Sequence, residues 1–312
     1  MNTKGSAVTF LLFFWGLVPC SAKPFQHQDT SATAPWAAHL DLTKLNSPPF
    51  DGFLLQVAGF DGVLQLQAVL KEEIAIDWQS LEGVTLFGAG EHPSETAIIL
   101  RGDLEKADLS RLPIANEIPP YHGVQIRRGP EWQKSPLIFA KQSNKEWVAG
   151  SSLQAVKTSM DLLADRKESG ITATLTEEAK KEVQSAAAMF ALDMKKLNGE
   201  LQFEADFTRA IQRAWFLIGS RGDLVEATLM IDSTDAEGLL FLQKQLQLLP
   251  VLLMSKQDCP AIWLELAAAI KVETKGNWIT LKVAASPEKA AAFLKSLGPL
   301  FLETPVSPDQ GN

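Results

Sequence analysis

The sequence is poor in cysteine, with only Cys20 and Cys259 among its 312 residues. Cys20 lies in a segment that we expect to be cleaved off after Ala22. Cleavage would leave Cys259 alone and would exclude a disulfide within the mature chain. No Cys/His cluster has the spacing of a zinc site. Cys259 stands before an apolar, helix-like run, and we interpret it as a buried or loop thiol rather than a nucleophile.

Runs of basic residues are also missing. The net charge is −8, and the densest basic spots are pairs, at Arg127-Arg128, Lys180-Lys181 and Lys195-Lys196. A nucleic-acid-binding protein usually carries a basic face, because neutralising phosphates supplies much of its affinity. The acidic balance therefore argues against nucleic acid as a partner, and against charge-driven binding to an anionic membrane surface.

No apolar run is long enough to cross a bilayer. Ala7–Val18 has twelve residues; as a helix it would reach about 18 Å, against about 30 Å for the hydrocarbon core. Lys4 precedes this run and small residues lead from it to Ala22, which is typical of a cleavable signal peptide. We therefore expect residues 1–22 to be a signal peptide, the mature protein to be periplasmic or secreted, and no transmembrane span to remain in it.

Cys20 allows a second interpretation. Leu17-Val18-Pro19-Cys20 loosely resembles a bacterial lipobox, in which the cysteine becomes the lipidated first residue, although Pro19 stands where that motif has a small residue. The chain would then be an envelope lipoprotein anchored through Cys20. Residues 23–35 are rich in Gln, Ser, Thr and Ala and lack apolar periodicity, so we predict a mobile leader there.

Catalytic and cofactor motifs are not found. The chain has four histidines, and no two of them have the spacing of a helical metal site: His27, His39, His92 and His122. We expect His39 to be partly exposed on a strand. Gly88-Ala89-Gly90 lacks the third glycine of a dinucleotide fingerprint and is better explained as a turn. The segment Ser286-Pro287-Glu288-Lys289 fits the catalytic motif Ser-x-x-Lys, but the motifs that accompany it in such enzymes are missing. A serine at a helix N-cap explains Ser286. We predict no catalytic residue, cofactor or metal ligand.

An internal repeat is the strongest positive signal. Val84–Asp103 reads as two strands joined by a Gly-containing turn, and the pattern returns 131 positions later at Trp215–Thr234. Leu40–Asn46 and Leu192–Asn198 share five of seven residues at an offset of 152. The first copy therefore carries about 21 extra residues, which fall within 51–82.

Each copy is predicted to run β-α-β-β-α, then strands, then a final helix. The predicted helices are 63–76, 104–112 and one capped by Ser151 or Ser152 in the first copy, and 203–214, 235–249 and one capped by Ser286 in the second. The order resembles a split βαβ unit. The sequence thus predicts an α+β fold, ferredoxin-like in part, made of two tandem copies of a β-α-β-β-α-β(β)-α unit with antiparallel sheets and helices on one face.

The predicted domain boundaries follow from this repeat. They are a signal peptide at 1–22, a leader at 23–35, the first unit at 36–169, the second unit at 170–302, and a flexible tail at 303–312. Two pairs of acids recur at matching positions, Glu95 with Glu226 and Asp41 with Asp193. We expect structural roles for both pairs, with Asp41 and Asp193 accepting backbone N–H groups where the chain turns after a strand.

Two segments carry a resemblance to a group of proteins. Pro35–Leu42 and the stretch from Ile76-Asp77-Trp78 to Gly83–Gly88 resemble the opening strand and the central segment of bacterial exported proteins of unknown function. The likeness covers most of both units through short apolar motifs. It implies an exported protein and no particular activity.

Three functions remain open at this stage. The first is a non-enzymatic periplasmic or cell-envelope protein that binds an envelope protein or a small ligand. The second is a hydrolase with a site between the two units, built from dispersed acids and His92 or His122. The third is the lipoprotein anchored through Cys20. The sequence favours the first.

Overall fold

The structure is a computed structural model. It describes residues 25, 29–31, 33–50, 71–72, 74–89, 95–112, 118–132, 135–165, 171, 175–197, 211–233, 235–254 and 260–293. The expected signal peptide and C-terminal tail lie outside these ranges, as do His27, His92 and both cysteines.

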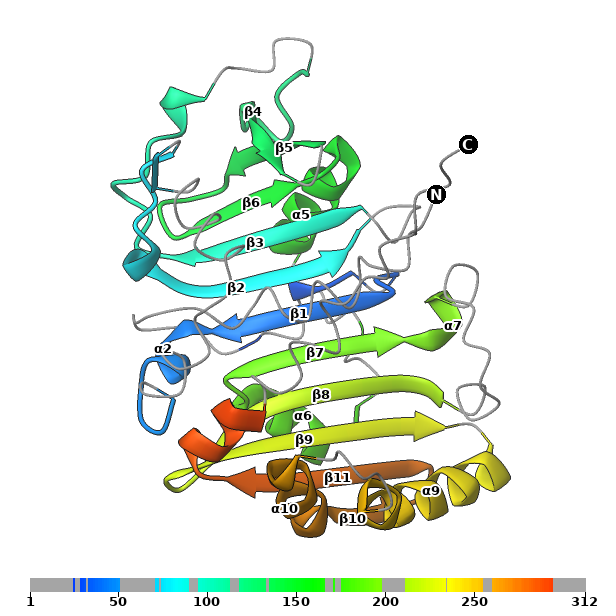
Figure 1. Cartoon of the computed structure of the whole chain (residues 1–312). Coiled ribbons are helices and arrows are strands. Elements are labelled where there is room, and N and C mark those ends of the chain that lie inside the picture. Colours follow the sequence, from blue (N-terminus) through cyan, green and yellow to red (C-terminus); the bar gives the residue numbers. More distant parts are fainter. Residues whose placement is uncertain are drawn as a thin grey trace, which may run out of the picture.

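One antiparallel sheet of eleven strands connects the two predicted units (Figure 1). Its strand order is β10-β11-β9-β8-β7-β1-β2-β3-β6-β5-β4. The first unit supplies β1 (Trp36–Asp41), β2 (Leu81–Gly88), β3 (Thr96–Gly102), β4 (Ile126–Trp132), β5 (Ser135–Lys141) and β6 (Glu146–Gly150). The second supplies β7 (Ala188–Asp193), β8 (Ile211–Arg221), β9 (Leu224–Ser233), β10 (Lys271–Lys275) and β11 (Trp278–Ala285).

The two halves of the sheet meet at β1 and β7, which pair antiparallel. Ala38 and Phe190 are register partners in this pair, and they are separated by the same 152 positions as the repeated opening segments. Sequence could not decide whether two separate sheets form. The structure shows that they form one, because each opening strand leaves an edge that the other covers.

The central hairpins of both halves are confirmed. β2 pairs with β3, and β8 pairs with β9 through a turn at Gly222, whose φ of +62° suits glycine. The predicted β10–β11 hairpin also forms, with Gly276 at φ +64° in its turn. Strands β5 and β6 join through the predicted turn, where the Ser143 hydroxyl accepts the backbone N–H groups of Lys145 and Glu146.

Helices cover both faces of the sheet, so the prediction of helices on one face is wrong. The helices are α2 (Leu42–Leu45), α5 (Leu153–Asp165), α6 (Glu177–Ser185), α7 (Met194–Leu197), α9 (Ala236–Met254) and α10 (Ala261–Ala269), and residues 287–293 are also helical. Val156 of α5 belongs to the same buried cluster as Met230 of β9, whereas Leu239 of α9 belongs to a cluster with Ile231, the next residue on β9. Neighbouring strand residues face opposite sides, so α5 and α9 lie on opposite faces. In Figure 1, α9 and α10 lie in front of the sheet and α6 lies behind it.

The sequence contained a signal for this arrangement. Every residue of β3 is buried, as are seven of the eight residues of β2. A strand that is apolar on both faces must be covered on both faces. The continuous runs in Val84–Phe87 and Ala97–Leu100 therefore indicated a sandwiched sheet rather than one with a wet side.

Two further element predictions are corrected. Residues 104–112 form only the 3-10 turn η3 (Leu109–Arg111), because the backbone N–H groups of Leu104 and Asp108 donate to the carbonyls of Asn144 and Ile74 on neighbouring segments. Residues 211–214 of the helix predicted at 203–214 belong to β8, and the rest lies outside the described residues. Most of the helix predicted at 63–76 is likewise not described.

The ferredoxin-like pattern is not formed. In a split βαβ unit another strand lies between the two strands that the helix connects, whereas β1 pairs directly with β2, and β7 pairs directly with β8. The fold class α+β is confirmed. None of the described helices combines the length and apolarity that crossing a membrane requires.

Candidate functional site

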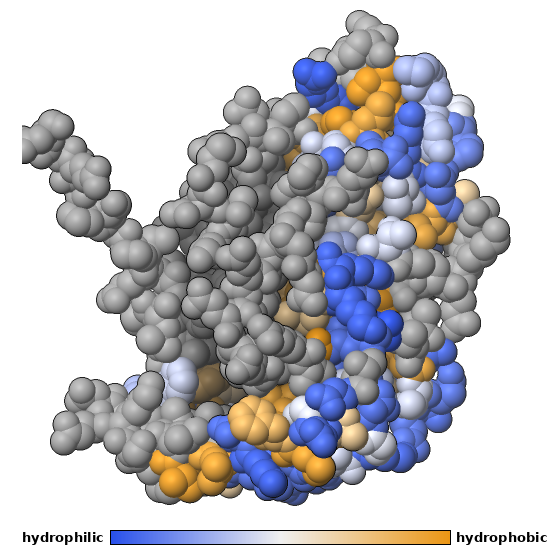
Figure 2. All heavy atoms as spheres, turned by 90° about the vertical axis from the view of Figure 1, so that its right-hand side faces the viewer, coloured by the Kyte–Doolittle hydropathy of each residue, from blue (hydrophilic) through white to orange (hydrophobic). Residues whose placement is uncertain are grey.

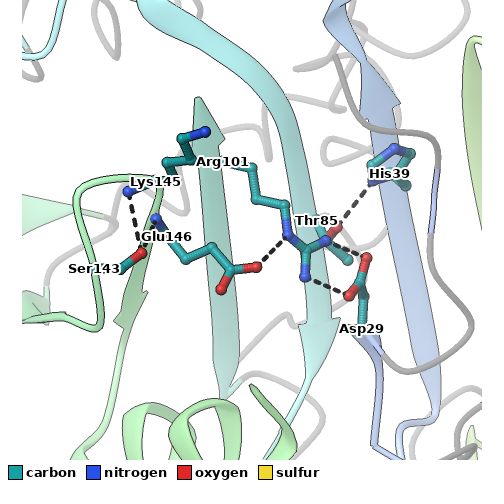
Figure 3. A network of polar contacts seen from close by, with 7 residues as sticks. All are labelled: Asp29, His39, Thr85, Arg101, Ser143, Lys145 and Glu146. Carbon is teal, nitrogen blue, oxygen red and sulfur yellow. Dashed lines mark hydrogen bonds and ion pairs between the residues drawn. The ribbon is translucent and has the colours of Figure 1, made fainter. Parts of the chain in front are cut away.

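Four polar side chains on one face of the sheet form the candidate site. His39 on β1 is the register partner of Thr85 on β2, and Arg101 on β3 is the register partner of Glu146 on β6. Alternation along the strands directs all four to the face that α5 covers. We call this group, His39, Thr85, Arg101 and Glu146, the polar floor (Figure 3).

Arg101 is the charged centre of the polar floor. Its side chain is only 4% exposed, and its Nε donates to Glu146 Oε1 at 3.0 Å. Its two terminal nitrogens donate to the two carboxylate oxygens of Asp29, Nη2 at 2.6 Å from Oδ1. Burial alone would lower the pKa of Arg101, but the hydrogen bonds and charges of Asp29 and Glu146 outweigh burial and raise the pKa above its usual value. Each of the three guanidinium nitrogens therefore donates to an acid, and the group is permanently charged.

His39 is buried and uncharged at neutral pH. Its Nδ1 lies 2.9 Å from Thr85 Oγ1, and its ring centroid lies 5.3 Å from that of Phe25. Within the described part of the chain, Nε2 is buried without a hydrogen-bond partner. Burial, followed by the positive charges of Arg101 and Lys44, lowers the pKa of His39 to about 3. The prediction of a partly exposed histidine is therefore wrong, because residues from outside the sheet cover this strand.

The covering residues come from the segment predicted to be a mobile leader. Phe25, Asp29, Thr30 and Ala34 are each at most 2% exposed. At these positions the chain is packed against the sheet. Two features of the sequence indicated such packing: a phenylalanine in an otherwise polar stretch, and an arginine in the apolar strand Thr96–Gly102, which needs an acid from elsewhere.

The acids Asp41 and Asp193 have the structural role that the sequence predicted. Asp41 Oδ1 accepts the backbone N–H of Lys44 at 3.0 Å, and Asp193 Oδ1 accepts that of Lys196 at 3.4 Å. Each carboxylate thereby caps the four-residue helix that follows its strand, α2 or α7.

The two halves also exchange matching contacts across the β1–β7 pair. Lys44 Nζ donates to the carbonyl of Ala186 at 3.2 Å, and Lys196 Nζ donates to that of Ala34 at 3.4 Å. The backbone N–H of Asp41 donates to Ala187 O at 2.8 Å, and that of Asp193 donates to Pro35 O at 2.8 Å. Adding 152 to the first residue number of each contact and subtracting 152 from the second gives its counterpart. The described junction is therefore nearly two-fold symmetric in its polar contacts.

This symmetry leads to a prediction about the two caps. Replacing Asp41 or Asp193 with alanine should lower the free energy of unfolding by about 1–2 kcal/mol, because each change removes one cap and its ion pair to a lysine. The Asp193 replacement should cost more, because it also removes the contact with Arg213 Nε. Asparagine at the same position keeps the acceptor oxygen and should recover most of the loss. Urea unfolding of the four variants measures this. An asparagine variant as unstable as the alanine variant would contradict the capping role.

A second charged cluster lies at the end of the sheet's second half. Arg213 Nε is 3.4 Å from Asp193 Oδ2, and its Nη1 is 3.7 Å from Asp232 Oδ2. The other carboxylate oxygen of Asp232, Oδ1, accepts from Asn277 Nδ2. Burial raises the pKa of Asp232, although the positive charges of Arg213 and Lys195 oppose the shift. Every charge here has a partner of opposite sign, so we assign the cluster to stability.

His122 belongs to an exposed cluster in the first half. Its Nε2 lies 2.8 Å from Asp161 Oδ1 on α5, and the same carboxylate accepts the hydroxyl of Tyr121 at 3.0 Å. The Lys157 ammonium lies 5.1 Å from the Tyr121 ring centre. The Asp161 hydrogen bond raises the pKa of Tyr121. Asp161 thus orients an imidazole that is 57% exposed.

The remaining sequence candidates have local roles. Glu95 accepts the Ser152 hydroxyl at 2.9 Å, and Glu226 lies 3.7 Å from Arg221 Nη1, so these two recurring acids have different partners. Ser286 accepts the backbone N–H of Lys289 at the start of helix 287–293, as a cap does, and Lys289 Nζ turns to Glu265. Among the described residues, no three His, Cys, Asp or Glu side chains gather as a metal site.

Comparison with known proteins gives no family. No family model matches the sequence, and no curated protein matches it. Two crystal forms of a protein named TP0453, forms III and I, are similar in structure at TM-scores of 0.49 and 0.48. Each is 10% identical in sequence, and the alignments cover 89% of this chain and 99% of that protein. Similarity at this level does not establish a shared fold or function.

Proposed function

We propose that this chain is an exported, non-enzymatic protein of the cell envelope that binds a partner protein through the outer face of α9. One observation carries the proposal. Of the five large apolar side chains that are exposed in the described part of the chain, four lie on α9: Leu240, Phe241, Leu248 and Val251. Exposed apolar side chains gathered in one place mark interaction sites more often than single ones do.

The helix α9 is apolar on two sides. Leu239 and Leu242 turn inward and pack with Ile231. Leu240 and Val251 turn outward and are 56% and 55% exposed. At 100° per residue, the four exposed side chains fall within about a third of the helix circumference. Apolar residues gather at the lower end of the molecule in Figure 2, the end at which α9 lies in Figure 1.

Charge on this face favours a different protein over a second copy. Lys244 is exposed within the apolar stripe. In an antiparallel pair of α9 helices centred on the stripe, the two Lys244 ammonium groups would lie within one helical turn of each other. Like charges in an apolar interface are costly. The occupant we propose is therefore an apolar surface of another envelope protein that carries a carboxylate opposite Lys244.

Site-specific photo-crosslinking tests the partner. A photoreactive residue at position 248 should give one defined adduct in intact cells, and the same residue at Glu273 on β10, also exposed, should not give it. Leu240→Glu combined with Val251→Glu should abolish the adduct without changing the melting temperature by more than a few degrees, because both side chains are exposed. An adduct that survives these substitutions, or forms equally from position 273, would overturn the proposal.

Cell fractionation with intact-mass measurement tests the export. A mature chain that starts at Lys23 in a soluble periplasmic or secreted fraction supports signal cleavage. A membrane-bound product with lipid mass on Cys20, lost in Cys20→Ser, would instead support the envelope lipoprotein. A product that keeps residues 1–22 in the cytoplasm would remove both forms of the export proposal.

We also propose that the chain arose by tandem duplication of one α+β unit. The reciprocal contacts of Lys44 with Ala186 and of Lys196 with Ala34 support this, because they repeat the sequence offset of 152. The pairing of Ala38 with Phe190 supports it in the same way. The two units differ in the sheet face that their final helices cover. The final helix of the first unit, α5, lies on the face opposite to α9. The final helix of the second unit, 287–293, packs through Ala291 with the core on the side of α9.

A hydrolase is the second candidate function, and the His122–Asp161 pair is the observation that favours it. A carboxylate that orients an imidazole is a common arrangement for a general base. Both residues belong to the first unit, so this site would not lie between the units. Loss of a hydrolytic activity in His122→Ala, with the activity kept in the α9 double variant, would favour this candidate.

A further inference from the structure

Within the polar floor, Arg101 is held by one acid that belongs to the sheet and by another that lies outside it. Glu146, the register partner of Arg101, holds one edge of the guanidinium from within the sheet. The two outer nitrogens are held by Asp29, which is outside the sheet. Without Asp29, both nitrogens would be buried donors without partners, a costly state. The sheet therefore presents a fixed fork that selects a carboxylate.

A second anchor lies four residues before Asp29. Phe25 is 2% exposed, belongs to the buried cluster that contains Ala37 and Phe87, and contacts the ring of His39. His39 is itself fixed by Thr85. An aromatic side chain and a carboxylate, four residues apart on one short segment, thus fill two neighbouring positions on the same sheet face. Positions that accept particular side chains at a set spacing give peptide recognition its specificity.

We propose that the polar floor is a peptide-binding site for a segment that carries an aromatic residue and, four residues later, a carboxylate. The chain's own Phe25 and Asp29 occupy it in the free protein. A partner segment of the same chemistry competes with them. This inference does not depend on the α9 surface, which lies on the opposite sheet face.

Effective concentration explains why the site is closed in the free chain. A tethered segment binds as if present at millimolar concentration, so a free peptide with equal contacts competes poorly until the tether is cut. Asp29 precedes β1 by only a few residues, which keeps the tether short. A partner must therefore bind more tightly than the native segment, or act when residues 25–34 are drawn away from the sheet.

Cutting the tether in the folded, full-length protein tests the proposal. A protease recognition sequence is inserted after Ser31, and the chain is cleaved after it has folded. The N-terminal fragment should stay bound through gel filtration. A synthetic peptide of residues 23–31 should displace it, and a peptide with Asp29→Asn should compete about tenfold less well, because it lacks the charge that pairs with Arg101.

The control peptide has the same composition, with Phe25 and Asp29 interchanged. It should not displace the fragment. Equal competition by the control or by the Asn peptide would overturn the proposal, since binding would then not depend on the two anchors. Release of the fragment with loss of near-UV circular dichroism would also overturn it, because the segment would then be an integral part of the core.

Discussion

Replacing Arg101 with methionine is expected to lower the free energy of unfolding by about 3–5 kcal/mol, the usual cost of removing one partner from a buried ion pair. The guanidinium contacts Asp29 through two nitrogens and Glu146 through the third. Without Arg101, the Asp29 carboxylate, which is 1% exposed, loses both of its hydrogen bonds to the guanidinium in the protein interior. Urea unfolding at pH 7, followed by circular dichroism, measures the loss.

Two controls separate this effect from a general loss of packing. Arg221→Met removes a pair with Glu226 in which the arginine is 64% exposed, so its cost should be below about 1 kcal/mol. Arg101→Met combined with Asp29→Leu and Glu146→Leu removes all three charges and should be more stable than Arg101→Met alone. If the triple variant were the least stable, the loss would come from shape rather than from unbalanced charge.

The local structure of this chain could be predicted because short-range chemistry determines it. Alternating residues and glycine turns indicated the β8–β9 and β10–β11 hairpins, and an oxygen-bearing residue after a strand indicated the caps of Asp41 and Asp193. These features involve residues that are close in sequence. Their energies depend little on the rest of the fold, and the structure contains them in the expected places.

The assembly of the sheet could not be predicted because it depends on pairings across long sequence separations. Nothing in Trp36–Asp41 specifies that β7 is its neighbour, since an antiparallel edge accepts many strands. The same difficulty applies to Arg101. Its presence in an apolar strand required a buried acid, but the sequence contains 37 acidic residues, and Asp29 lies 72 positions away.

The helix predicted at Leu104–Leu112 shows how tertiary bonds override local preference. Its apolar spacing fits a helix, yet Leu104 and Asp108 donate their backbone N–H groups to Asn144 and Ile74. A segment whose backbone groups are satisfied by neighbouring chain has little to gain from forming a helix. Periodicity cannot report those neighbours.

Acidification from pH 7 to pH 5 is expected to lower the free energy of unfolding by about 2 kcal/mol through His39 alone. In the unfolded chain its pKa is the ordinary 6.5, and in the folded protein burial lowers the pKa to about 3. Between these values the unfolded state binds a proton that the folded state does not. The contribution of His39 to stability is therefore complete above pH 6.5 and falls as the pH drops toward 3, by about 1.4 kcal/mol per pH unit.

A variant without the titrating ring isolates this effect. His39→Phe keeps an aromatic ring beside Phe25 and should flatten the slope between pH 7 and pH 5, even if its stability at pH 7 is lower because Thr85 loses a partner. Unfolding free energies of the unchanged protein and of His39→Phe at pH 7, 6 and 5 measure the two slopes. An unchanged slope in His39→Phe would mean that His39 is not held neutral by burial, and that the floor beneath residues 25–34 is open to water.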